Sequence, residues 1–116
     1  MKVIIAGSRE GFTYQDVVTA MFNCGFTSEV TEVVSGGARG VDRLGETWAA
    51  YNDIPVKQFI PDWDGLGKKA GHVRNRDMGD YSDALIALWD GKSKGTKGMI
   101  EYAEKKGLKV YVYLKE

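Results

Sequence analysis

The stretch Val33-Val34-Ser35-Gly36-Gly37-Ala38-Arg39-Gly40-Val41-Asp42 decides how this sequence folds. A short apolar run of β-branched residues leads into three glycines within five positions, and an amphipathic segment follows from about Val41 to Tyr51. This order predicts a buried strand that turns sharply into a helix. The first backbone N–H groups of such a helix are unpaired and carry a partial positive charge, so they attract anions. The stretch therefore predicts a phosphate-binding loop, although glycines that serve only a tight turn would give the same pattern.

The spacing of these glycines excludes two common nucleotide-binding motifs. It is not the Gly-x-Gly-x-x-Gly pattern, because no glycine lies three residues beyond Gly40. It also lacks the Gly-Lys-Ser/Thr ending of a P-loop. A phosphate contact at this loop must therefore use a different geometry.

Length and composition indicate one ordinary globular domain, which we expect to span residues 1–116. Apolar residues make up 43% of the chain and charged residues 28%, and the formal net charge is zero. A neutral chain produces no overall field that attracts nucleic acid, so the composition disfavours a nucleic-acid partner. Cys24 is the only cysteine, which excludes an internal disulfide and fits a reducing compartment. No apolar run approaches the roughly eighteen residues of a membrane span, so we expect a cytoplasmic protein without membrane contact.

Hydrophobic periodicity and turn residues predict five strands that alternate with four helices. The predicted strands are 2–6, 32–35, 56–60, 84–89 and 108–114. The predicted helices are 14–23, 41–51, 72–81 and 96–106. This alternation specifies an open parallel five-stranded sheet covered by helices on both faces, a Rossmann-like three-layer α/β/α sandwich. In such sheets ligands bind at the carboxyl ends of the strands, where the strand order reverses.

Polar and glycine-rich residues gather at the carboxyl ends of the predicted strands. Gly7-Ser8-Arg9 ends the first strand, and the glycine-rich stretch ends the second. Residues 61–64 follow the third strand and 89–96 follow the fourth, whereas the turns at the opposite edge are plainer. This asymmetry predicts a binding site for a small anionic ligand at the carboxyl edge of the sheet.

Three motifs resemble the signature set of the SLOG superfamily, and in particular its YspA-type branch. They are Gly7-Ser8-Arg9, the run from Ser35 to Asp42, and Ala70-Gly71-His72-Val73-Arg74-Asn75-Arg76-Asp77-Met78. The superfamily includes the LOG (lysine-decarboxylase-like) phosphoribohydrolases and the DNA-processing protein DprA, and the resemblance covers essentially the whole chain. It implies a Rossmann-like fold and a nucleotide-derived ligand.

The resemblance to the LOG enzymes is incomplete at their catalytic glutamate. Gly95-Thr96 matches part of their Pro-Gly-Gly-x-Gly-Thr-x-x-Glu motif, but Met99 occupies the glutamate position and Asn75 replaces a lysine. Hydrolysis of an N-glycosidic bond requires an acid or base beside the ribose. Cleavage by this chain would therefore need another carboxylate. The Ser-Gly-x-Ala-x-Gly-Val-Asp pattern of DprA, in contrast, is intact from Ser35 to Asp42.

The candidate acid–base residues are Asp42 and Glu46, which lie one helical turn apart on the same face. Asp42 would also stabilise its helix through the dipole without any catalytic role. The candidate ligand-binding residues are Gly7, Ser8, Arg9, Ser35, Gly36, Gly37, Ala38, Arg39, Gly40, Arg74, Asn75, Gly95 and Thr96. The arginines could clamp a phosphate or could simply be solvent-exposed.

The remaining aromatic and acidic residues give weaker indications. Trp89 continues an apolar strand and should belong to the core, whereas Trp63 lies between two aspartates and is the better candidate for stacking on a base. Asp62, Asp64 and Asp90 are scattered over two loops, so we expect no metal site and no cofactor.

These observations predict a protein that binds a nucleotide or nucleotide-sugar derivative, such as a nucleoside monophosphate or an ADP-ribose-like molecule. If it is an enzyme, cleavage of the N-glycosidic bond is the expected reaction. The alternatives are non-catalytic sequestering or sensing of a nucleotide signal, and DprA-like binding of single-stranded DNA. We also expect a homo-oligomer, a dimer or higher, because small α/β domains with aromatic helix faces often associate.

Overall fold

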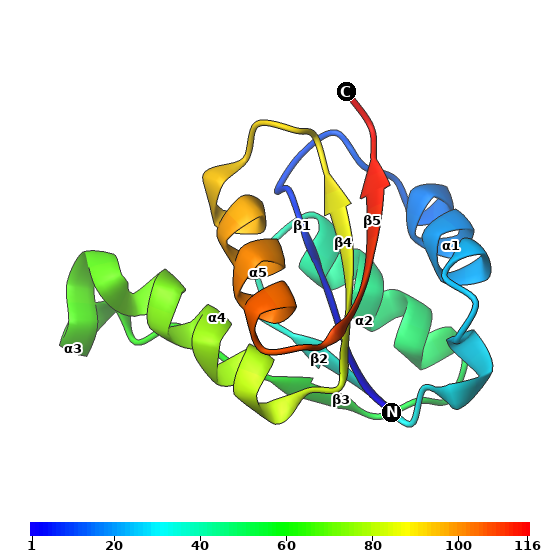
Figure 1. The fold of residues 1–116 in the computed structure, drawn as a ribbon, viewed down its shortest axis with the longest axis horizontal. Coiled ribbons are helices and arrows are strands. Elements are labelled where there is room, and N and C mark those ends of the chain that lie inside the picture. Colours follow the sequence, from blue (N-terminus) through cyan, green and yellow to red (C-terminus); the bar gives the residue numbers. More distant parts are fainter.

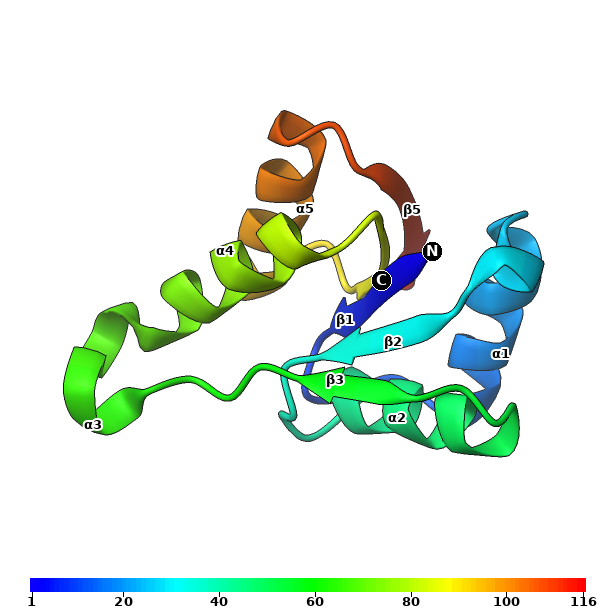
Figure 2. The same ribbon diagram turned by 90° about the horizontal axis from the view of Figure 1, so that it is seen from below.

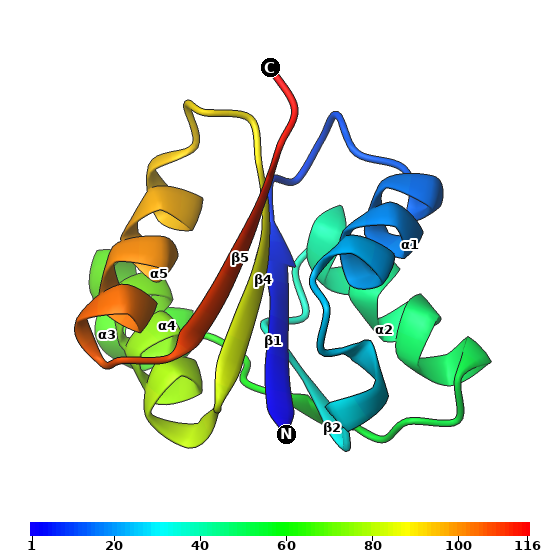
Figure 3. The same ribbon diagram turned by 45° about the vertical axis from the view of Figure 1, so that its right-hand side comes forward.

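A computed structural model describes residues 1–116 as three layers, with a parallel sheet between two groups of helices (Figures 1 and 3). The strands are β1 (Lys2–Gly7), β2 (Glu32–Ser35), β3 (Val56–Gln58), β4 (Ala84–Trp89) and β5 (Lys109–Leu114). The helices are α1 (Tyr14–Asn23), α2 (Val41–Tyr51), α3 (Trp63–Leu66), α4 (Ala70–Tyr81) and α5 (Lys94–Lys105). The predicted Rossmann-like α/β architecture is thus confirmed.

The strand order places a reversal in the middle of the sheet. The order is β3-β2-β1-β4-β5, and all neighbouring strands are parallel. The chain builds outward from β1 to β3 and then crosses to β4 on the other side of β1. The carboxyl ends of β1 and β4 therefore flank the crevice where doubly wound sheets bind ligands.

Alternate residues of the central strands face two separate cores. Val3 and Ile5 of β1 pack with α1 and α2, and Trp48 lies in this core at 6% exposure. Ile4 and Leu85 face the other side and pack with α4 and α5. The central strands are consequently buried on both faces, as a parallel sheet between two helical layers requires.

Most element boundaries agree with the sequence, and the main difference follows β3. The predicted strand to Ile60 ends at Gln58, and the predicted long loop contains α3 and a 3₁₀ turn at Gly67–Lys69. Asp62 explains the short helix, because its Oδ1 accepts the Gly65 N–H at 2.9 Å and so caps the first turn. The segment of residues 59–69, which we call the arm, carries α3 and the start of α4 away from the sheet (Figure 2). A short 3₁₀ turn at Thr27–Glu29 was also not predicted.

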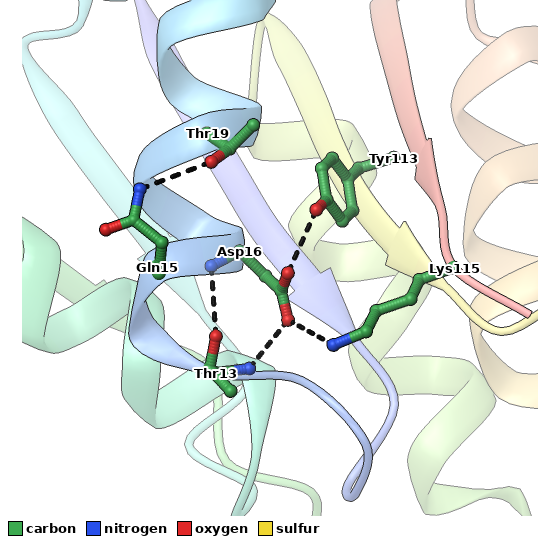
Figure 4. A network of polar contacts seen from close by, with 6 residues as sticks. All are labelled: Thr13, Gln15, Asp16, Thr19, Tyr113 and Lys115. Atoms are coloured by element: carbon green, nitrogen blue, oxygen red, sulfur yellow. Dashed lines mark hydrogen bonds and ion pairs between the residues drawn. The ribbon is translucent and has the colours of Figure 1, made fainter.

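A closed polar network ties the edge strand β5 to the start of α1 (Figure 4). Thr13 caps α1, and the Asp16 carboxylate returns a bond to the Thr13 N–H at 2.8 Å. The Tyr113 hydroxyl and the Lys115 ammonium donate to the same carboxylate at 2.9 and 2.8 Å. Burial raises the pKa of Asp16, but the hydrogen bonds from Lys115, Thr13 and Tyr113 outweigh it and lower the pKa to about 2. This carboxylate therefore stabilises the fold in its charged form.

None of the helices combines the length and apolar character that crossing a membrane requires.

Candidate functional site

A cavity of about 580 Å³ opens at the strand reversal, between the end of β1 and the start of α5. The predicted site residues that line it are Gly7, Ser8, Arg9, Ala38, Arg39, Asp42, Arg74, Asn75, Gly95 and Thr96. A second cavity of about 470 Å³ adjoins it and adds Gly36 and Gly37. Ser35, Gly40 and Glu46 line neither cavity. The structure thus brings residues from β1, α2, α4 and α5 to one place.

Arg74 connects α4 to the loop between β2 and α2. Its Nη1 donates to the Gly36 carbonyl at 2.7 Å, and its Nε donates to Asn75 Oδ1 at 2.9 Å. A Cβ at position 36 would overlap Nη1, so a side chain there would displace the guanidinium from this position. Burial lowers the pKa of Arg74, and the Asp42 carboxylate counteracts that effect. Arg74 lines both cavities, so its charge lies at their junction.

Asp42 is the buried carboxylate of the first cavity, at 6% exposure. Its Oδ2 accepts the Ala38 N–H at 3.1 Å. Burial raises the pKa of Asp42 to about 6, although the Ala38 hydrogen bond and the charges of Arg74 and Arg9 oppose the increase. A carboxyl with a pKa near neutrality can accept a hydroxyl proton or release one during a reaction.

Glu46 has a different environment, although it lies one turn beyond Asp42 on α2. Its Oε2 accepts the Ser35 hydroxyl at 2.6 Å and the Gln58 side-chain amide at 2.8 Å. These bonds connect α2 to β2 and β3. Of the two candidate acid–base residues, only Asp42 therefore faces a cavity.

Three amides of the glycine-rich stretch, those of Gly37, Ala38 and Val41, donate to other groups of the chain, so they are not among the unpaired groups that the sequence predicts. The Gly37 N–H donates to Ser35 Oγ at 3.1 Å. The Val41 N–H, at the start of α2, donates to the Ser8 carbonyl at 3.2 Å. The loop therefore holds its own turn and the end of β1 in place.

Gly40 shows the same supporting role. It has a φ of 82°, and a Cβ there would lie 2.5 Å from the Arg9 carbonyl oxygen. Glycine at this position therefore lets the backbone of Arg9 cross directly over the loop. That crossing fixes the base of the Arg9 side chain at the edge of both cavities.

The start of α5 supplies the opposite wall of the first cavity. Ser93 caps this helix, and its hydroxyl lies 3.2 Å from the Thr96 hydroxyl. Gly95 has open space where a side chain would be. The helix start carries a partial positive charge. Ser8 lines the same cavity, and its hydroxyl is buried without a hydrogen-bond partner. Two independent features of this cavity thus suit an anionic or polar ligand.

The floor of the first cavity is apolar. Met78 of α4 and Met99 of α5 are almost fully buried and line it. Met99 occupies the position of the catalytic glutamate in the LOG enzymes, so α5 contributes no carboxylate at this point. Sulfur-containing side chains of this kind adapt to flat or irregular ligand surfaces.

Charges of both signs line the first cavity, so its lining is as balanced as the whole chain. Arg39 and Glu10 form an ion pair of 3.2 Å at the exposed rim. Asp90 accepts the N–H groups of Lys92 and Ser93, both at 2.8 Å, and so shapes the turn before α5. The lining side chains that sequence reasoning did not name as site candidates are Glu10, Met78, Asp90, Ser93 and Met99. Asp90 and Ser93 lie in the 89–96 segment that the sequence places at the carboxyl edge of the sheet, and that placement could have identified them.

Comparison with known proteins assigns the family. The sequence model of the YspA, cpYpsA-related SLOG family matches residues 1–65, which include the Gly7-Ser8-Arg9 motif and the glycine-rich loop. The chain belongs to this SLOG family. The Gene 61 protein of Mycobacterium phage D29 is similar to it, with 38% identity over 85 residues that cover 67% of each chain.

Two solved structures share the fold of this SLOG protein. DNA processing protein A (DprA) from Streptococcus pneumoniae matches 96% of this chain and 49% of its own, with a TM-score of 0.74 and 20% identity. DNA processing protein A from Helicobacter pylori matches 97% of this chain and 64% of its own, with a TM-score of 0.72 and 22% identity. The SLOG chain thus spans about half to two thirds of these DprA chains.

These similarities correct one expectation. The neutral composition led us to disfavour nucleic acid as a partner, and that inference was wrong. The Helicobacter pylori protein was solved to describe how it binds single-stranded DNA, and its structure shares the fold of almost this entire chain. A zero net charge averages over local clusters such as Arg9, Arg39 and Arg74, which line a second cavity without a carboxylate, so it does not exclude nucleic acid.

Proposed function

We propose that this SLOG protein binds a nucleotide or nucleotide-sugar derivative, a nucleoside monophosphate or an ADP-ribose-like molecule, in the cavity between β1 and α5. The observation that supports this most strongly is the convergence of Arg9, Arg74 and the buried Asp42 on one cavity. Guanidinium groups bind phosphate oxygens in pairs of parallel hydrogen bonds. Membership of the SLOG family supports the same ligand class.

The two ends of such a ligand would meet different walls of the cavity. The phosphate lies between Arg9 and the start of α5, where the hydroxyls of Ser8 and Thr96 donate to its oxygens. A ribose hydroxyl donates to Asp42, which is the buried acceptor on the opposite side. Residues 1–116 act as one domain in this proposal, since both cores share a single sheet.

Cleavage of the ligand would depend on Asp42. It is the buried carboxyl of the cavity, and its raised pKa is suited to proton transfer near neutral pH. Product formation that disappears in Asp42→Asn would make the protein a nucleotide N-glycosidic hydrolase. Binding without product would make it a protein that sequesters or senses a nucleotide.

The similarity to the Helicobacter pylori DNA processing protein favours a second candidate function, the binding of single-stranded DNA. The arginines at the junction of the two cavities would then contact backbone phosphates. Such binding weakens steeply with added salt, because each neutralised phosphate releases counterions. Binding of one small nucleotide depends on salt much less.

The test is a thermal-shift screen with nucleoside monophosphates, ADP-ribose, NAD and cyclic nucleotides. A ligand that binds only the folded state at a hundredfold excess over its Kd stabilises it by about 2.7 kcal/mol. In a domain of this size that raises Tm by several degrees. We expect Arg9→Ala and Arg74→Ala to lose the shift and Arg43→Ala, an exposed arginine outside both cavities, to keep it.

Two results would contradict the proposal. One is the absence of a shift with every compound, together with salt-sensitive binding of single-stranded DNA. The other is a shift that survives both arginine substitutions.

A further inference from the structure

The second cavity is an apolar extension of the first. It shares Arg9, Ala38, Arg39 and Arg74 with the first cavity, so the two are continuous across the arginines. Its outer wall is formed by Ile60 and Pro61, which follow β3, and by Trp63, the first residue of α3. We refer to this second cavity as the Trp63 pocket.

The Trp63 pocket leaves large apolar side chains exposed. Ile60 is 65% exposed and Trp63 is 53% exposed, although both border a cavity of about 470 Å³. Exposed apolar groups that surround a cavity of this size are typical of ligand-binding sites. The proposed mononucleotide site does not use either side chain.

Local structure holds Trp63 in this position. Asp62 caps α3, which fixes the direction in which the next residue leaves the helix. The Trp63 ring approaches Gly71 of α4, where a Cβ would lie 3.8 Å from Cη2. Ile60 Cδ1 lies against Gly37, where a Cβ would come within 2.8 Å. These contacts fix the walls of the pocket, which the arm forms where it extends beyond the sheet (Figure 2).

The charges of the two cavities differ in a way that indicates what each binds. The first cavity contains Glu10, Asp42 and Asp90 as well as its arginines. The Trp63 pocket contains no carboxylate. An anionic group therefore fits at the arginines between the cavities, and a neutral aromatic group fits against Trp63. Indole and guanidinium faces are the surfaces on which nucleobases stack.

We propose that the Trp63 pocket binds a nucleobase that is joined through phosphate to the nucleoside in the first cavity. The preferred ligand is then a dinucleotide unit whose linking phosphate lies between Arg9 and Arg74. This inference rests on the proposed nucleotide site and extends it to a second base. The unit is either a free dinucleotide or part of a single strand, because both present the same bases and phosphate.

The experiment compares adenosine monophosphate with the dinucleotide pApA, by calorimetry, in the wild type and in Trp63→Ala. Stacking on an aromatic residue strengthens binding by roughly 5- to 150-fold per base. We expect pApA to bind the wild type at least about fivefold more tightly than the mononucleotide. We expect Trp63→Ala to abolish that gain while it leaves mononucleotide affinity unchanged.

Two further variants separate stacking from general damage to the arm. Trp63→Phe keeps an aromatic face and should retain most of the gain. Leu66→Ala removes an apolar side chain of α3 that is 42% exposed but lines neither cavity, so the gain should persist in full. Quenching of tryptophan fluorescence by pApA, and not by ribose 5-phosphate, gives an independent signal of stacking.

The outcomes distinguish this inference from the proposed function. An affinity for pApA that Trp63→Ala does not change, or one equal to that for the mononucleotide, overturns the second base site and leaves the first intact. Failure of both ligands to bind overturns this inference, and the proposed function falls with it only if every other compound of the thermal-shift screen also fails to bind.

Oligonucleotides of increasing length identify the source of the dinucleotide unit. An affinity that reaches its maximum at two nucleotides indicates a free dinucleotide. An affinity that continues to rise with length, and falls steeply with salt, indicates a single strand. Either result supports the second base site only if Trp63→Ala abolishes the gain in affinity from the first nucleotide to the second.

Discussion

Asp16 and Asp42 each lie in the first turn of a helix, and each is largely buried, at 9% and 6% exposure. Their surroundings nevertheless differ. Asp16 receives hydrogen bonds from a backbone N–H, a tyrosine hydroxyl and a lysine ammonium. Asp42 receives one hydrogen bond, from the Ala38 N–H of the preceding loop, while the nearby Arg74 guanidinium donates to the Gly36 carbonyl.

The pKa values reflect this difference. Burial raises both, but at Asp16 the hydrogen bonds outweigh burial and lower the pKa to about 2. At Asp42 burial prevails and raises the pKa to about 6. A carboxylate whose acceptor positions are filled stabilises the fold. One that is buried with positions left open costs stability and is available to a ligand.

The largest expected effect comes from the arginine beside Asp42. Arg74→Ala removes a charged donor from the junction of the two cavities, so nucleotide affinity should fall by about 10- to 100-fold. Isothermal titration calorimetry measures this loss, with Arg43→Ala as the control. An unchanged affinity would show that Arg74 serves only the Gly36 contact.

Asp16→Asn should be the larger of two effects on stability. It breaks the ion pair with Lys115 and weakens the bond with Tyr113, so the free energy of unfolding at neutral pH should fall by about 1–2 kcal/mol. Urea denaturation measures this change. Asp64→Asn, which alters an exposed carboxylate on α3, is the control and should have no measurable effect. Equal stability of the two variants would exclude a structural role for the network in Figure 4.

Asp42→Asn should change stability in the opposite direction. The amide keeps an acceptor for the Ala38 N–H but removes the buried charge, so we expect a gain of about 1 kcal/mol at pH 8. Nucleotide binding should weaken in the same variant, because the acceptor for the ribose hydroxyl loses its charge. Destabilisation comparable to that of Asp16→Asn would contradict the difference between the two carboxylates.

The pH dependence of stability follows from the same two groups. The folded-state pKa of Asp42, about 6, exceeds its ordinary value of 3.8, so the folded state holds the proton longer. Its contribution favours the folded state at low pH and is lost as the pH rises from about 4 to about 6. Asp16 behaves in reverse, since its stabilisation is present above pH 3.8 and is lost as the pH falls towards 2. Urea denaturation across this range should show Asp42→Asn without the decline between pH 4 and 6.

The smallest effect is expected at the exposed rim. Glu10→Gln breaks the ion pair with Arg39, but both side chains are mostly exposed, at 83% and 68%. Such pairs contribute less than about 1 kcal/mol, so the free energy of unfolding should change by less than about 0.5 kcal/mol. A larger change would show that an exposed carboxylate such as Glu10 can stabilise the fold as a buried one does.

The sequence predicted the sheet and the four long helices α1, α2, α4 and α5 well, because their signals are local. Apolar periodicity identified α1 and α2, and the predicted end of the second strand at Ser35 agrees with β2. The arm after β3 was missed, since its short helix depends on one capping contact from Asp62 and has little apolar periodicity.

The site was predicted in outline but not in its internal roles. The rule that ligands bind at the carboxyl edge placed Arg9, Asp42 and Arg74 together, as the structure does. The roles of Gly36 and Gly40 could not be predicted, because they admit Arg74 and the backbone of Arg9 from distant parts of the chain. The role of Glu46 could not be predicted either, because its partner Gln58 comes from β3, a distant part of the chain.

The most direct measurement is a titration of the aspartate side-chain carboxyl groups by ¹³C NMR, with and without the nucleotide that gives the largest thermal shift. We predict that Asp42 titrates near pH 6 and that the ligand changes this value, whereas Asp16 titrates near pH 2 and does not respond. A carboxyl of Asp42 that titrates near its ordinary value of 3.8 and ignores the ligand would contradict the account.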